Sequence, residues 1–471
     1  MRRVLGIDLA VTAQCRACLA DARGEVVVER RFRIRRNELE ALFEAATEGM
    51  SEDDELVVVM EPTSSMWIAP SAFFSVKGAT VHLVPPEQAA DLRRYYNKHV
   101  KNDRIDAKLL ARLPLLHPGG LHNAHVPRGP QGVLKRIVRR RARLISELGQ
   151  HRHRVRSTLH YAMPGLNEIL GDQLGRAAMA LLGRYGSPRA MLRVGKARIA
   201  TLFIKNSNGQ WRHDKAEQVL AAARAAIELW DGLDGCDFEE IAEDLACEAR
   251  IIRTLEAEIA DLDARAAGLL AEVDPDGLLL SLPGFGERTA TTVAGRLGDV
   301  RRFPNAAALR SFIGIIPGTD QSGEAQARPR LTKSGDRMLR TALFLAAETA
   351  RKEDPQLADV YLRHLEKGNH HTKALCAVAT ALANRLAAVL REGRPYEIRD
   401  VDGKVIDART AKAAITERSR GAAELRAARR QLTPAKRQKE RHLDGVRSKA
   451  KPSPPGEVTP ANDARAVARS A

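Results

Sequence analysis

Two acidic residues, Asp103 and Asp106, lie three positions apart in the segment Lys-Asn-Asp-Arg-Ile-Asp-Ala-Lys, where a predicted helix over 104–113 begins. Side chains at this spacing point to the same side of a helix, so the two carboxylates would form one acidic face. Buried together without compensation they would repel each other, whereas a divalent cation between them would remove the repulsion. The structural alternative is that Asp103 caps the helix and both acids lie near its positive end.

Two further acids stand at the ends of predicted strands. Asp8 closes a short apolar strand over 3–8, and Glu61 directly follows the apolar, β-branched run 56–60. Open α/β sheets bind ligands beyond the carboxyl ends of their strands, so we expect these two acids to converge with the acidic pair on the helix. Taken singly, Asp8 is equally well explained as a turn residue and Glu61 as a surface acid. The combination of four is the more specific pattern.

A cluster of this kind predicts a metal site for phosphodiester chemistry. Oxygen-only ligands suit Mg²⁺ or Mn²⁺ rather than zinc. Two such ions about 4 Å apart can hold the attacking and the leaving oxygen of a phosphodiester.

The elements that must position these acids read as an alternating α/β unit. Apolar alternation and turn residues predict a β-meander, and longer periodic segments then alternate between helix and strand. The predicted strands are 3–8, 15–20, 25–33, 56–60 and 80–84, and the predicted helices are 38–47, 67–77 and one that starts at 86.

Two long helices are predicted after this unit. The helix over 134–162 is rich in arginine and almost free of acids, which favours contact with a polyanion over a merely solvated face. A partner helix over 241–273 has apolar residues spaced by threes, fours and sevens, so the two are expected to pair as an antiparallel coiled coil. The helical insert 164–234 between them has no chemistry that we can assign.

The C-terminal third contains two weaker signals. The turn Leu282-Pro283-Gly284-Phe285-Gly286 before a helix resembles a helix-hairpin-helix turn, whose glycines expose amides to a phosphate. Ser322 lies in a polar loop with basic residues downstream, where a serine could attack a phosphate. Ser-Gly pairs in loops are common, however, and the residue taken alone is better explained as a turn residue.

Composition narrows the class of protein. The chain has 471 residues, a net charge of +17, 44% hydrophobic and only 4% aromatic residues, which indicates several domains with aliphatic cores and a surface that attracts nucleic acid or an anionic membrane. No apolar run approaches the roughly 20 residues that span a bilayer, and no signal peptide precedes the first strand, so we expect a cytosolic protein. Five scattered cysteines argue against a disulfide framework.

An ordered set of motifs runs along the chain: Gly6-Ile7-Asp8, Glu61-Pro62-Thr63, residues 101–107, Leu282-Pro283-Gly284, residues 312–317, Gln321-Ser322-Gly323 and residues 331–335. From residue 3 to about residue 391, this set resembles the transposases of insertion-sequence family 110.

The expected fold is of α/β plus mostly α class in four parts. The resemblance implies an N-terminal RNase H or RuvC-like domain over 1–125 and an α-rich serine transposase domain, which contains the helix-hairpin-helix-like turn, over 276–395. The sequence patterns themselves predict the other two parts, a basic coiled-coil region with the helical insert over 130–275 and a basic, largely disordered tail over 396–471.

It also implies a site and partners. Asp8, Glu61, Asp103 and Asp106 match the family's metal-binding tetrad, with Mg²⁺ as the expected ion and Mn²⁺ as a substitute, and Ser322 matches its nucleophile. The expected partners are DNA, a noncoding guide RNA and further copies of the chain as dimers or tetramers, without a membrane. The expected location is the cytoplasm, in association with the nucleoid.

Two other functions remain open at this point. The four acids could activate water in a RuvC-like nuclease that hydrolyses branched DNA, with Ser322 as a structural residue. Alternatively, the chain could be a noncatalytic nucleic-acid-binding protein in which the acids only cap helices and face solvent.

Overall fold

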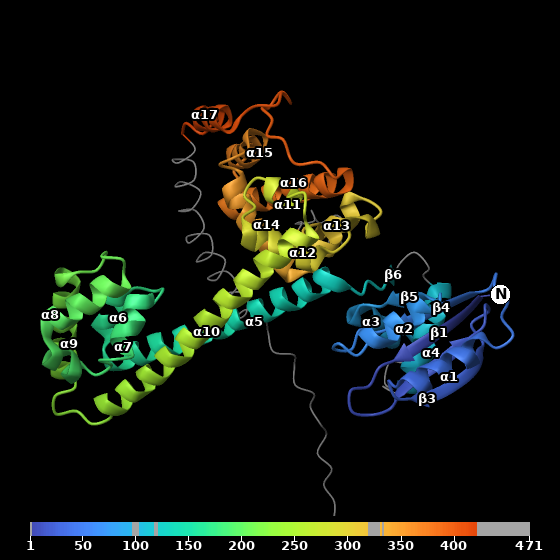
Figure 1. Ribbon diagram of the computed structural model, residues 1–471, viewed down its shortest axis with the longest axis horizontal. Coiled ribbons are helices and arrows are strands. Elements are labelled where there is room, and N and C mark those ends of the chain that lie inside the picture. Colours follow the sequence, from blue (N-terminus) through green and yellow to red (C-terminus); the bar gives the residue numbers. More distant parts are fainter. Residues whose placement is uncertain (1, 97–102, 117–120, 319–329, 332–333, 422–471) are drawn as a thin grey trace, which may run out of the picture. The chain divides into compact units, whose positions relative to one another are not determined.

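The structure is a computed structural model that describes residues 2–96, 103–116, 121–318, 330–331 and 334–421. The chain divides into two compact units, residues 1–132 and 133–471, shown in Figure 1. The acidic residues singled out above belong to the first unit, and Ser322 falls in the sequence of the second but outside the described residues.

The first unit is built on a six-stranded mixed sheet with the order β3-β2-β1-β4-β5-β6. Strand β1 pairs in parallel with β4, and β4 with β5, whereas β2, β3 and β6 join their neighbours in antiparallel fashion. The strands are β1 (Arg2–Asp8), β2 (Cys15–Ala20), β3 (Val26–Phe32), β4 (Glu55–Met60), β5 (Thr80–Leu83) and β6 (His122–Asn123). The expected α/β character of this region is confirmed.

Helices cover both faces of this sheet. They are α1 (Arg36–Thr47), α2 (Ile68–Val76), α3 (Pro86–Tyr96) and α4 (Asp103–Leu116). Alternate residues of each strand face opposite sides: Leu5 and Ile7 pack with α1 and α2, whereas Val4 packs with Leu110 and Leu113 of α4. Gly6 and Asp8 share the α4 face with Val4 by this alternation.

The second unit is organised around two long helices, α5 (Gly129–Ala162) and α10 (Phe238–Val273), which run side by side in Figure 1. One end of the pair joins the core of the insert, formed by α6 (Pro164–Leu170), α7 (Arg176–Leu182), α8 (Pro188–Asn206) and α9 (His213–Leu229). The other end joins the core of the C-terminal helices. The predicted pairing of the two helices is therefore observed, and each end is fixed by its own hydrophobic core.

The C-terminal core contains α11 (Leu278–Ser281), α12 (Glu287–Leu297), the 3-10 turn η2 (Val300–Arg302), α13 (Ala306–Ile313), α14 (Arg337–Ala350), α15 (Pro355–Glu366) and α16 (His371–Glu392). Beyond it, in the stretch whose composition suggested a disordered tail, α17 (Ala408–Arg418) packs on α15, and Arg418 pairs with Glu366 at 2.7 Å. The sequence from 396 therefore begins with an ordered segment.

Helix α16 corrects the expectation that no apolar run approaches membrane-spanning length. Among the described residues it alone has the length and composition of such a span. Leu382 and Leu386 on this helix are fully buried in the C-terminal core, so core packing accounts for its apolar character.

Candidate active site

The parallel pairing of β1 with β4 brings Asp8 and Glu61 to the same edge of the sheet. Ile7 is opposite Met60, Asp8 closes β1, and Glu61 directly follows β4. Both acids are half-buried. Val57 and Val59 face α4, so alternation assigns Glu61, like Asp8, to the α4 face. The convergence of these two acids follows from the strand register.

Helix α4 lies directly against β1 because residue 6 is glycine. A Cβ atom at Gly6 would be 2.2 Å from the carbonyl oxygen of Ala107 and 2.4 Å from the amide nitrogen of Ala111. These distances are far below van der Waals contact, so any side chain at this position would push the helix away. The close packing of α4 on β1 thus explains why the Gly6-Ile7-Asp8 motif begins with glycine.

Helix α4 runs antiparallel to β1, which brings its N-terminal turn to the edge that carries Asp8. Near the other end of α4, Arg112 donates a hydrogen bond from Nε to the carbonyl oxygen of Gly24 at 3.1 Å, and Gly24 lies beyond the end of β2, on the side where β1 begins. Asp106 lies in the first turn of α4 and is only 9% exposed.

Asp103 is the first residue of α4, three positions before Asp106, but its side chain is outside the described part of the chain. Among the side chains that are described, no three His, Cys, Asp or Glu residues form a group that could hold a metal ion. The donor set of Asp8, Glu61 and Asp106 nevertheless consists of carboxylates alone, which is the chemistry that Mg²⁺ and Mn²⁺ prefer.

Ser322 lies outside the described residues, but the segments that flank it are held together. Strand β7 (Pro317–Gly318) pairs with β8 (Arg330–Leu331) in antiparallel fashion. Further out, the amide of Asp336 donates to the carbonyl oxygen of Phe312 at 2.8 Å. The described segments that precede residue 319 and follow residue 329 therefore lie next to each other.

Cations gather near these flanking segments. Arg296 forms an ion pair with Asp336. Arg302 lies over the rings of Phe303 and Phe312, with its Cζ 4.3 and 4.5 Å from the ring centroids. This group could not be predicted from the sequence, because its members come from separate elements and nothing in their spacing signals the contact.

Lys135 of α5 completes this group. Helix α5 lies close to α12, since a Cβ at Gly295 would be 3.2 Å from the carbonyl oxygen of Leu134. Burial, together with the positive charges of Arg296 and Arg302, lowers the pKa of Lys135 from 10.5 to about 8. Three basic side chains, Arg296, Arg302 and Lys135, thus lie near the described segments that flank residues 319–329.

In the helix-hairpin-helix-like turn, Gly284 contacts an acid and a neighbouring helix rather than being free to bind phosphate. The amide of Gly284 donates to the Glu353 carboxylate at 2.7 Å, so an acid already occupies it. A Cβ at Gly284, whose φ is +75°, would lie 2.3 Å from the carbonyl oxygen of Ala346 in α14. This glycine is required by helix packing.

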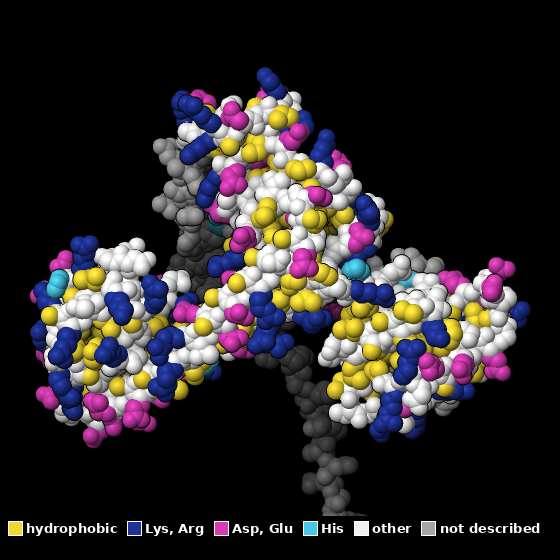
Figure 2. Space-filling model, viewed as in Figure 1, with side chains coloured by type: hydrophobic (Ala, Val, Ile, Leu, Met, Phe, Trp, Pro, Cys, Tyr) yellow, Lys and Arg dark blue, Asp and Glu magenta, His cyan; other side chains and the backbone are white. Residues whose placement is uncertain are grey.

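Several of the arginines that were expected to face a polyanion instead pair with acids of α10. Arg152 contacts Glu256 at 2.7 Å, and Arg140 contacts Glu258 at 3.4 Å. Arg141 pairs with Asp263, and His151 pairs with Glu248 at 2.6 Å. Figure 2 shows acidic side chains beside basic ones along this helix pair. Only part of the basic surface of α5 is therefore available to a partner.

Comparisons with known proteins match two segments of the chain to transposases. A DEDD transposase model of IS110 matches residues 5–164, and the model of the transposase IS116/IS110/IS902 family matches residues 276–362. Together the matched segments span more than half of the chain.

Two of the similar proteins extend over most of the chain, and a third matches about a quarter of it. The chain is 28% identical to the 43.6 kDa protein of insertion element IS110 from Streptomyces coelicolor, over 84% of this chain and 95% of the relative. It is 25% identical to the 44.8 kDa protein of insertion element IS116 from Streptomyces clavuligerus, over 69% of this chain and 80% of the relative. It is 29% identical to the pilin gene-inverting protein of Moraxella bovis, over 26% of this chain and 38% of that protein.

Proposed function

Because the chain belongs to the IS110 family of transposases and is a DNA transposase or recombinase, we propose that it excises and inserts a mobile element through a covalent link between DNA and Ser322. The observation that carries the proposal is the shared edge of the sheet at which Asp8, Glu61 and the first turn of α4 meet. The fold we infer for this unit is RNase H or RuvC-like.

The acids would hold the metal. Asp8, Glu61, Asp103 and Asp106 are the residues that we propose as ligands, with Mg²⁺ as the ion and Mn²⁺ as a substitute. Bound there, the ion would offset the negative charge that develops on the phosphate. The DEDD family match supports divalent metal dependence in general.

Ser322 would hold one DNA strand covalently during strand exchange. As the Ser322 Oγ forms its bond to phosphorus, the bond from phosphorus to one deoxyribose oxygen breaks, and the serine proton ends on that oxygen. The hydroxyl of a second strand then bonds to the same phosphorus, the bond from phosphorus to the Ser322 Oγ breaks, and the proton of that hydroxyl returns to the serine. Each exchange conserves the phosphodiester bond energy, so no nucleotide cofactor is needed.

We further propose a noncoding RNA as the guide, dimers that assemble into tetramers, and association with the nucleoid in the cytoplasm. The net charge of +17 supports contact with nucleic acid. Base pairing with a guide would supply the sequence specificity and would leave little trace in side chains.

A denaturing-gel assay for a covalent protein–DNA adduct tests the proposal. Purified protein is mixed with element-end DNA, the flanking noncoding RNA and Mg²⁺, with Ser322→Ala and, as a control at an exposed serine, Ser334→Ala in parallel. We expect an adduct with wild type and Ser334→Ala and none with Ser322→Ala, and reactions without RNA should lose it too. If DNA is cut without an adduct and Ser322→Ala cuts equally well, the protein is a hydrolytic nuclease instead.

A further inference from the structure

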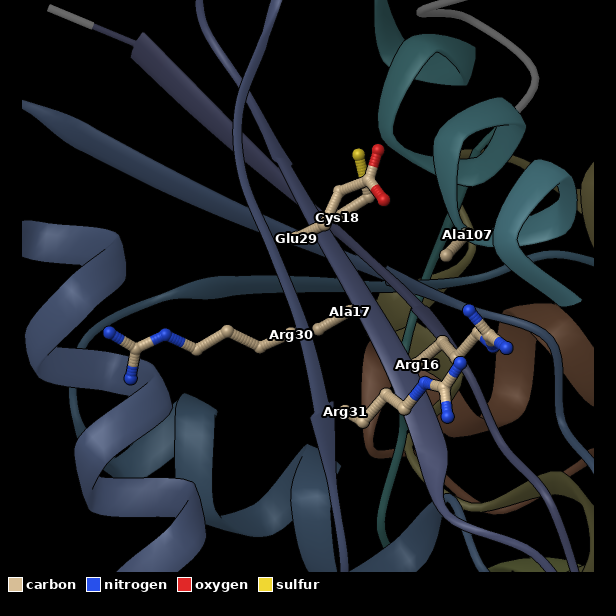
Figure 3. Close-up of a pocket in the computed structure, with 7 residues that line it drawn as sticks. All are labelled: Arg16, Ala17, Cys18, Glu29, Arg30, Arg31 and Ala107. Carbon is tan, nitrogen blue, oxygen red and sulfur yellow. The ribbon is translucent and has the colours of Figure 1, made fainter.

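A cavity of about 250 Å³ opens on the first unit between β2, β3 and α4. Arg16 and Arg31 line one end of it, and in Figure 3 their side chains extend together with their guanidinium groups next to each other. Cys18 and Glu29 line the other end, and Arg30 extends in a different direction. Two arginines thus converge beside the edge that carries the acids.

The two arginines are directly opposite each other in the sheet. Arg16 pairs with Arg31 in the antiparallel register of β2 and β3. Like charges in directly opposed positions destabilise a sheet, so the position of Arg31 opposite Arg16 is not explained by folding stability. Neither arginine forms an ion pair or hydrogen bond with another described residue, whereas Glu29 on the same face pairs with Lys108 of α4 at 2.7 Å.

The pair continues the row of acids across the sheet. Asp8 is opposite Arg16 in the register of β1 and β2. Cys18 and Ala20 pack with Ala107 and Ala111 of α4, so alternation assigns Arg16 to the α4 face as well. The order across three neighbouring strands is therefore Arg31, Arg16, Asp8, and the strands are about 4.8 Å apart.

The two positive charges in this row indicate that the ligand is an anion. A guanidinium group binds phosphate through two parallel hydrogen bonds, and two such groups provide a strong anion site. A nucleic-acid strand with its reacting phosphate at the acids would bring its next phosphates over the neighbouring strands of the sheet.

We propose that Arg16 and Arg31 bind backbone phosphates of a nucleic-acid strand next to the phosphate that reacts, and so position that strand on the acids. The inference rests on the proposed function, because it takes the acids to be the reacting centre. The arginines act as positioning residues, and the ligand is the phosphodiester backbone rather than the bases.

The test replaces one phosphate of the element-end DNA at a time with an uncharged methylphosphonate. Binding of the full-length protein with its RNA is measured in Ca²⁺, so that the result does not depend on cleavage. With wild type we expect one or two positions beside the reacting phosphate at which the affinity falls about tenfold, the loss typical of a charged hydrogen bond. In Arg16→Ala/Arg31→Ala the affinity should already be lower, and the same positions should have no further effect.

Arg30→Ala is the matched control. Arg30 neighbours Arg31 on the same strand, but its Nη1 contacts the carbonyl oxygen of Ala41 in α1 at 3.4 Å. This variant should keep the wild-type interference pattern. Thermal unfolding of the double variant should be nearly unchanged, because it removes both the like-charge pair of Arg16 with Arg31 and the opposite-charge pair of Arg16 with Asp8. This measurement separates a binding role from a structural one.

An unchanged interference pattern in the double variant would overturn the proposal, even if wild type forms the covalent adduct in Mg²⁺. A pattern that disappears in the double variant supports the phosphate site, even if no adduct forms and the transposition mechanism fails. The two assays therefore judge the two proposals separately.

Discussion

Gly6 and Ala107 are in such close contact that a Cβ atom on the glycine would lie 2.2 Å from the alanine carbonyl oxygen. This contact fixes α4 against β1 and so determines how near the acid at the end of β1 comes to the acids in the first turn of α4. A single methyl group at the glycine thus tests the connection between the fold and the proposed site.

We expect Gly6→Ala to lower the free energy of unfolding by about 2–3 kcal/mol, the upper part of the range for overpacking a tight core. It should also abolish adduct formation, because α4 is displaced from the sheet edge. Urea unfolding and the adduct gel measure the two effects. The control is Gly149→Ala in α5, where a Cβ meets nothing within 4 Å and alanine should stabilise the helix. Full activity in Gly6→Ala would contradict this account of the site.

Asp106→Asn tests the role of the acids with little change in shape. The side chain is largely buried, so the amide keeps its volume but loses the charge that a metal ligand needs. We expect adduct formation to fall at least about 100-fold, as for the loss of a main electrostatic contribution to catalysis, while DNA binding in a gel shift is retained. Asp53→Asn, an exposed acid before β4, should behave as wild type. Normal activity in Asp106→Asn would rule out the metal hypothesis in this form.

Lys135 gives a pH-dependent prediction. Its pKa is lowered to about 8 in the folded state, chiefly by burial, so the folded protein binds fewer protons than the unfolded chain between pH 8 and 10.5. Stability therefore rises with pH across this window, and the full penalty is present below pH 8. Lys135→Met should unfold at higher urea than wild type at pH 7, and the difference should shrink by pH 10. The exposed Lys373→Met serves as the reference variant, and a difference that is equally large at both pH values would refute the prediction.

The sheet and the meeting point of its acids could be predicted from the sequence because both depend on local patterns. Apolar alternation marks the strands, and the ends of parallel strands meet by geometry, so Asp8 and Glu61 were found. Strand β6 has only two residues, His122–Asn123, and carries no periodic signal. Its place at the sheet edge is set by pairing with β5, which the sequence does not reveal.

Charge pairing between distant segments could not be predicted in the same way. The local sequence of α5 contains few acids, so its arginines looked free, yet the acids that pair with them come from α10. The row of Arg31, Arg16 and Asp8 likewise appears only once the strand register is known. None of these side chains stands out in the sequence, because its significance depends on the residues that folding brings next to it.

The arginines of α5 that lack acidic partners should therefore carry its contact with nucleic acid. Arg136, Arg139 and Arg143 are exposed and fall on one side of the helix by their spacing of three and four, whereas Arg152 pairs with Glu256. Replacing the three exposed arginines with alanine should reduce the slope of log affinity against log salt by roughly 2–3, since each phosphate contact contributes about 0.7–0.9.

The matched variant is Arg152→Ala, which should lower the free energy of unfolding by up to about 1 kcal/mol and leave the salt slope almost unchanged. Fluorescence anisotropy with labelled RNA or DNA at several salt concentrations gives the slope, and urea unfolding gives the stability. If the triple variant keeps the wild-type slope while Arg152→Ala reduces it, the ion pairs between α5 and α10 must open when nucleic acid binds. The free face of α5 would then not be the contact surface.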